Sequence, residues 1–192
     1  LIIEPKIKLT FIGGDDKNND TPNRDSADFR IDSANMFLTN RFQGYDYILP
    51  GARADIGLSA FTNSELRGSL HGFTGVSRRH TGDVPSGLST GTDTDLSDYV
   101  ATVSAEKENL YAFSWSGRIN STSSNLDQSR TTLSTRLQNA RFIIAHTQLT
   151  QNYFTSADSD LEEASVSISQ RLKNGVNLRA SQNWDLSDNN VY

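Results

Sequence analysis

The chain has 192 residues and no cysteine, so its length is that of about one domain, and disulfides and cysteine-based zinc sites are excluded. Its net charge is −5 at pH 7, without the basic stripe that is typical of a nucleic-acid-binding module, so we expect no nucleic-acid partner. No apolar run approaches the roughly 20 residues that a membrane helix requires. The longest, residues 142–145, is short enough for a strand, and a helical membrane protein is therefore excluded.

Apolar and polar side chains alternate along most of the chain. In residues 109–120, Tyr111, Phe113 and Trp115 share one parity, while Ser114 and Arg118 share the other. Because side chains point to opposite faces along a strand, this pattern predicts a strand with one apolar and one polar face. The same pattern predicts about nine strands, at 1–12, 46–61, 66–79, 97–106, 109–120, 128–138, 140–151, 162–173 and 175–186.

Short and long connections alternate between these strands. Short turns are predicted at 62–65, 107–108, 138–139 and 173–175, and long connections near 13–45, 80–96, 121–127 and 152–161. Asn174-Gly175 is a strong hairpin signal because both residues tolerate a positive φ. Strict alternation places all tight turns at one end of the sheet, as in outer-membrane barrels, whose periplasmic turns are short and extracellular loops long.

The predicted fold is an all-β, antiparallel, up-and-down transmembrane β-barrel, of which this chain holds about nine strands. We expect residues 1–192 to form part of a single outer-membrane β-barrel domain cut from a longer polypeptide. The alternating parity also predicts two sets of residues. The candidate lumen-facing residues are Arg53, Asp55, Arg118, Arg141, Arg171 and Arg179, and the candidate lipid-facing residues are Ile56, Leu58, Phe113, Trp115, Val166 and Ile168.

Nothing in the sequence predicts catalysis, a cofactor or a metal site. The three histidines, His71, His80 and His146, lack zinc-site spacing. Carboxylates gather in the long connections at 15–20, 93–98 and 158–160, but none matches a calcium-binding loop; whether they bind divalent cations stays open. We therefore predict no catalytic residue and no metal ligand.

The connection at 13–45 is unusually rich in aromatic and charged residues. Asp32 or Ser33 is suited to cap a short helical turn around residues 35–37. Apolar groups in so long a connection indicate an ordered segment folded into or over the barrel mouth. We expect Phe37 and Phe42 to be its apolar anchors, and Arg41 to be its polar anchor through a carboxylate such as Asp25 or Asp46.

Three motifs in residues 20–60 resemble one known family. They are Pro22-Asn23-x-Asp25-Ser26, Asn35-x-Phe37-x-x-Asn40-Arg41-Phe42-x-Gly44-Tyr45-Asp46, and Gly51-x-Arg53-Ala54-x-x-Gly57-Leu58. With them the chain resembles the barrel domain of the lipopolysaccharide-assembly protein LptD, in its alphaproteobacterial form. The remaining strands are compatible with this family but carry no signature of their own.

The resemblance implies a non-enzymatic translocator that assembles lipopolysaccharide into the outer leaflet of the bacterial outer membrane. It implies three partners besides the membrane: lipopolysaccharide, the plug lipoprotein LptE, and periplasmic lipopolysaccharide bridge proteins that bind through a domain outside this chain. Two alternatives remain open from the residues alone. A general porin or autotransporter-type barrel shares the alternation, and a soluble extracellular β-rich binding module would bury its apolar parity in a core.

Overall fold

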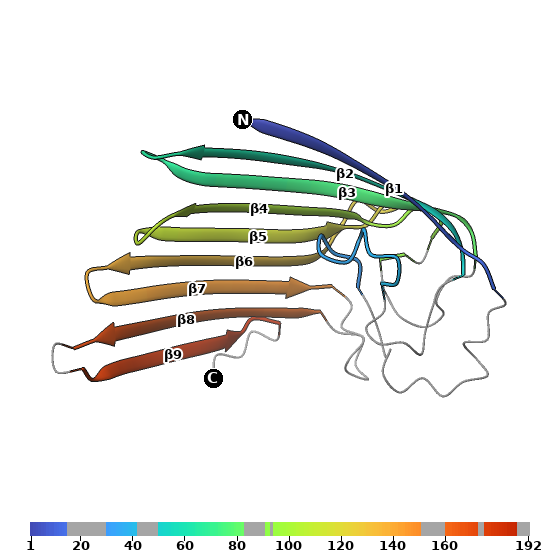
Figure 1. Ribbon diagram of the computed structural model, residues 1–192. Coiled ribbons are helices and arrows are strands. Elements are labelled where there is room, and N and C mark those ends of the chain that lie inside the picture. The colour runs from blue at the N-terminus through green and yellow to red at the C-terminus, as the bar shows by residue number, and fades with distance from the viewer. Residues whose placement is uncertain are drawn as a thin grey trace.

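The computed structural model describes residues 1–14, 30–41, 50–82, 91–92, 94–150, 160–172 and 175–187. Within them, nine strands form one sheet in chain order, and each strand is antiparallel to the next (Figure 1). This confirms the predicted all-β, up-and-down fold, which is the arrangement of a partial barrel. The strands are β1 (Ile2–Ile12), β2 (Gly51–Ser64), β3 (Gly68–Thr81), β4 (Tyr99–Lys107), β5 (Tyr111–Ile119), β6 (Leu126–Leu137), β7 (Ala140–Leu149), β8 (Leu161–Arg171) and β9 (Asn177–Asp185).

Tight turns join the strands at one end of the sheet, at the left in Figure 1. Asn109 and Gln138 adopt positive φ values of 58° and 52° there, and Gly175 has a φ of 84°. The predicted turn at 62–65 is wrong in position, because Thr62 and Asn63 still pair with Leu70 and Ser69, and the turn falls at residues 65–67. We call this end the turn end, and the opposite end the loop end.

Cross-strand register separates two faces. On one, Leu133 is paired with Phe113 and Ile144, and Ile144 with Val166, so apolar side chains run across four strands. Ile144 remains 51% exposed and Ile7, on the same face of β1, 73% exposed. All six candidate lipid-facing residues lie on this apolar face, and all six candidate lumen-facing residues lie on the other, which we call the polar face.

The buried apolar cluster of the described residues lies on the polar face. It consists of Ile31, Met36, Phe73 and Val100, with Phe37 packed against it. Phe73 and Val100 come from β3 and β4, whereas the others come from the segment between β1 and β2. The sheet is therefore covered at the loop end by its own connection, while the apolar face has no such cover among the described residues. No helix in the described part of the chain is long and apolar enough to cross a membrane.

Candidate functional site: a docked segment on the polar face

Residues 30–41 form a compact turn rather than an extended link. The Asp32 carboxylate accepts hydrogen bonds from the backbone N–H groups of Ala34 and Asn35, both at 2.8 Å. In return, Asn35 Oδ1 accepts a hydrogen bond from the backbone N–H of Asp32 at 2.9 Å, and the Met36 N–H donates to the Asp32 carbonyl at 3.0 Å. This reciprocal capping satisfies the free donors of the turn. The predicted cap by Asp32 is confirmed.

Two paired glycines make room for the segment on the sheet. Gly57 of β2 and Gly75 of β3 are cross-strand partners on the polar face. A Cβ at Gly75 would lie 2.5 Å from Met36 Sδ, and one at Gly57 would lie 2.8 Å from the Phe37 ring. Phe37 meets Phe73 edge to face, with ring centroids 6.2 Å apart. Burying a side chain such as fully buried Met36 contributes about 1.5–3 kcal/mol, so the glycines create a stabilising socket.

A buried ion pair holds the end of the segment. Arg41 Nη2 lies 2.6 Å from Asp55 Oδ1, and the two side chains are 3% and 0% exposed. The same nitrogen donates to Ser77 Oγ at 2.8 Å and to the Met36 carbonyl at 2.9 Å, while Ser77 donates to Asp55 at 2.6 Å. Each member is thus hydrogen-bonded, the condition under which a buried pair is tolerated. Burial lowers the pKa of Arg41 to about 10, and Asp55 opposes this, so Arg41 stays charged at neutral pH.

Two further cationic side chains donate hydrogen bonds to the backbone carbonyl groups of the segment. Arg53 donates to the carbonyls of Leu38 and Thr39, the latter at 2.8 Å, and lies 3.4 Å from Asp55. Lys8 donates from Nζ to the Phe37 carbonyl at 2.7 Å and to Thr39 Oγ1 at 2.8 Å. Cations commonly bind the unpaired carbonyls at the end of a helical turn. Strands β1 and β2 therefore hold the segment through hydrogen bonds from Lys8 and Arg53, while its apolar side chains pack over the Gly57–Gly75 socket.

A second segment, residues 91–92 and 94–98, reinforces this arrangement at the loop end. Arg118 of β5 lies 3.2 Å from Asp98, and both side chains are buried. The Asp98 N–H donates to the Gly91 carbonyl at 2.8 Å, and Ser97 and Ser77 exchange two hydrogen bonds of 2.8 and 2.9 Å. A Cβ at Gly91 would lie 2.8 Å from Ile31 Cγ2, so the two segments touch. Together they form what we call the cap, residues 30–41 and 91–98 as far as they are described.

The structure brings some predicted residues together and separates others. Phe37, Arg41, Arg53, Asp55 and Arg118 belong to the cap or its supports. Asn35 and Asn40 lie in the segment as well, and the described partner of Arg41 is Asp55. The remaining motif residues, and the expected carboxylate partners of Arg41, lie outside the described residues: Pro22, Asn23, Asp25, Ser26, Phe42, Gly44, Tyr45 and Asp46.

Three candidate residues lie away from the cap. Arg141, Arg171 and Arg179 are on the polar face, but at the turn end of β7–β9. The predictions missed Lys8, Met36 and Ser77, although the polar parity of Lys8 in β1 was a usable signal. His146 lies on the apolar face, 3.0 Å from Glu162. Within the described residues, no group of three His, Cys, Asp or Glu side chains is arranged to hold a metal ion.

An up-and-down antiparallel sheet with one exposed apolar face and one polar face is the architecture of an outer-membrane β-barrel wall. Comparison with family models identifies which kind: residues 1–189 match LptD, described as LPS transport system D. The chain belongs to the LptD family, whose members act in lipopolysaccharide transport at the outer membrane. A search among curated proteins found no match.

Proposed function

We propose that this chain is part of the barrel wall through which lipopolysaccharide is translocated into the outer leaflet, and that the cap is an ordered closure of the barrel mouth. The polar face is then the lumen and the apolar face the lipid-facing surface. The observation that carries the proposal is the Arg41–Asp55 pair, which fixes a long connection onto the polar face at 2.6 Å in nearly complete burial. A connection that served only as a tether needs no such anchor.

Orientation in the membrane follows from the two ends of the sheet. Barrels in the outer membrane have short periplasmic turns and longer extracellular loops. We infer that the turn end faces the periplasm and that the cap lies at the extracellular mouth. In this arrangement all nine strands belong to the wall of one barrel, so residues 1–192 form part of a single barrel domain.

The function is transport without covalent chemistry. In the family that the chain resembles, a plug lipoprotein, LptE, occupies the lumen, and periplasmic bridge proteins deliver lipopolysaccharide. We infer the same partners for the intact protein. A polar lumen supports this role because the sugar and phosphate groups of lipopolysaccharide need a wet path, while its acyl chains need lipid.

The test is Arg41→Ala in the intact protein, with Arg130→Ala as the matched control. Arg130 lies on the polar face of β6, paired with Ser116 and Thr147, outside the cap. Loss of Arg41 removes the ion pair with Asp55 and loosens the cap, whereas the wall strands keep their pairing. We expect normal levels of folded barrel but increased sensitivity to large hydrophobic antibiotics for Arg41→Ala alone.

Unchanged antibiotic exclusion at normal expression, together with rapid protease cleavage of the wild-type segment on intact cells, contradicts the proposed role. That result identifies residues 30–41 as a tether.

A further inference from the structure

Four arginines gather on the polar face at the turn end, in a region that the cap does not reach. Arg136 of β6 is the direct cross-strand partner of Arg141 of β7. Arg141 and Arg179 are both paired with Ser169 of β8, from opposite sides, and Arg171 lies two residues further along β8. All four arginines line one open groove of about 560 Å³. We call these four residues the arginine cluster.

No described carboxylate forms an ion pair with the cluster, although Glu106 and Glu108 line a neighbouring pocket with Arg136 and Arg141. No carboxylate lines the groove itself among the described residues. Arg136 donates to the Asn109 side chain at 3.0 Å, which is a neutral partner. Like charges placed directly opposite each other on neighbouring strands are unfavourable. The Arg136–Arg141 pair is therefore unfavourable by itself, and a bound anion would relieve the repulsion more directly than Glu106 and Glu108, which form no described ion pair with it.

The lining of the groove favours a small, highly charged anion over a protein segment. Its side chains on the polar face are the arginines with Ser169 and Asn177, whereas its two aliphatic residues, Ala140 and Leu178, have the parity of the apolar face. Protein interfaces depend on buried aromatic and aliphatic anchors, and the polar-face side chains of the groove provide none. Guanidinium groups bind phosphate through paired, charge-assisted hydrogen bonds.

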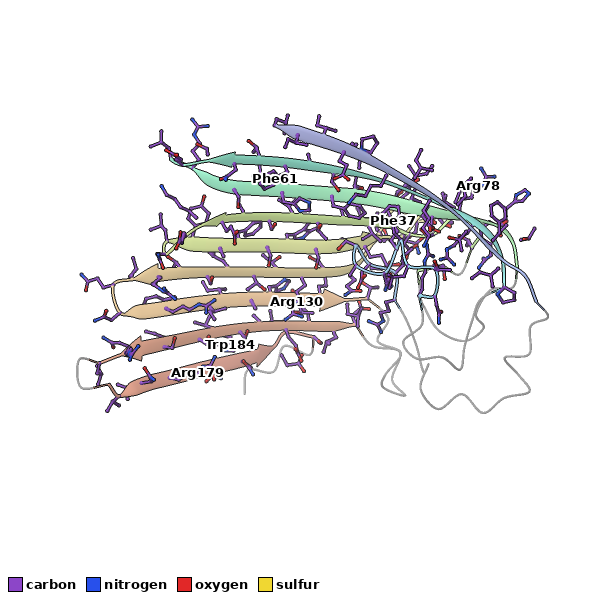
Figure 2. All side chains as sticks on the ribbon, viewed as in Figure 1. Phe37, Phe61, Arg78, Arg130, Arg179 and Trp184 are labelled. Atoms are coloured by element: carbon purple, nitrogen blue, oxygen red, sulfur yellow. The ribbon has the colours of Figure 1, made fainter. Side chains whose placement is uncertain are left out.

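We propose that the arginine cluster is a phosphate-binding site for lipopolysaccharide, located on the lumen wall near the periplasmic end. This rests on the proposed function, and it names the chemical groups that the wall recognises. Arg41, Arg53 and Arg118 are not part of such a site, because Asp55 and Asp98 pair with them. Figure 2 shows Arg179 on β9 nearer to the turn end than Arg130 on β6. Arg130 lies on the same face but outside the cluster, so its substitution serves as a control for the cluster variants.

The experiment measures binding of purified lipopolysaccharide, and of the same material after chemical removal of its phosphates, to the intact protein in detergent. Wild type is expected to bind the phosphorylated form more tightly, with an affinity that falls as salt rises. The double variant Arg141→Gln/Arg179→Gln should weaken binding of the phosphorylated form by about tenfold or more, since it removes charged hydrogen bonds. It should leave binding of the dephosphorylated form unchanged. Arg130→Gln should change neither.

Each outcome decides between explanations. Equal wild-type affinity for the two forms overturns the phosphate site, and this comparison requires no variant to fold. An equal loss in Arg130→Gln shows that only general charge matters and also overturns it. Loss of the co-purifying plug protein with unchanged lipopolysaccharide binding assigns the cluster to an acidic protein partner instead. Complete absence of lipopolysaccharide binding by wild type contradicts the proposed function itself, which is a different result.

Discussion

The arginines of the polar face lie in two different electrostatic environments. At the loop end of β1–β5, Arg41, Arg53 and Arg118 pair with Asp55 or Asp98 and are covered by the cap. At the turn end of β6–β9, the arginine cluster has no described ion pair and lines an open groove. The strands alternate in the same way in both regions. The difference lies in what covers the polar face: the Gly57–Gly75 pair leaves room for the cap, and Asp55 and Asp98 pair with the arginines there, whereas no described segment covers the arginine cluster.

The largest expected effect comes from removing the carboxylate of the sealed region. Asp55→Ala leaves Arg41 and Arg53 without their buried counter-charge, which typically costs about 3–5 kcal/mol. Glu163→Ala removes a carboxylate from the exposed polar face of β8 and should have little effect. Denaturant unfolding of the intact protein, refolded into lipid vesicles, measures both. Similar free energies of unfolding for the two variants would show that the ion pairs under the cap stabilise the protein no more than an exposed carboxylate of β8 does.

Two neighbouring isoleucines of β7 allow the two faces to be compared outside the cap. Ile144 lies on the apolar face opposite Leu133, whereas Ile143 lies on the polar face opposite Ser134. Ile144→Arg should cost about 2–4 kcal/mol if the site lies near the bilayer midplane. Ile143→Arg should be far milder, because its side chain enters a polar, uncovered space. Comparable losses in the same vesicle assay mean that the faces do not separate lipid from lumen.

Two glycines of β3 provide a smaller and local contrast. Gly75→Ala places a methyl group 2.5 Å from Met36 Sδ, whereas a Cβ at Gly72 meets nothing closer than the Thr102 carbonyl oxygen at 4.0 Å. Overpacking of this kind costs about 1–3 kcal/mol, and we expect it to appear as faster proteolysis of residues 30–41. Gly72→Ala should retain wild-type resistance. Resistance in both variants rules out the socket as a determinant of docking.

The strands and their faces were predictable because apolar and polar side chains alternate with a period of two within each segment of the sequence. Lumen and lipid candidates such as Arg179 and Val166 were assigned to opposite faces by parity alone, and the register separates them in the same way. The boundary of β2 was not predictable, since Thr62 and Asn63 are polar and join the strand only through pairing with β3.

The docking partners were harder to predict than the docked segment. The aromatic and charged content of 13–45 indicated an ordered element, and Asp32 was recognisable as a cap. The choice of Asp55 as partner of Arg41, and the meeting of Gly57 with Gly75, depend on register between strands and on the path of the connection. The local sequence contains no information on the register between strands or on the path of the connection. The Arg136–Arg141 juxtaposition was hidden for the same reason.

Cysteine accessibility at two positions of the segment tests the central claim most directly. Met36 is fully buried in the socket, whereas Leu38, two residues later, is 51% exposed. In the intact protein, with any cysteine elsewhere replaced, Leu38→Cys should react with an impermeant maleimide on whole cells and Met36→Cys should not. Adding Arg41→Ala should make the cysteine at position 36 reactive. Equal reaction of both cysteines in the otherwise wild-type protein contradicts docking, and no reaction of the cysteine at position 38 contradicts the extracellular position of the cap.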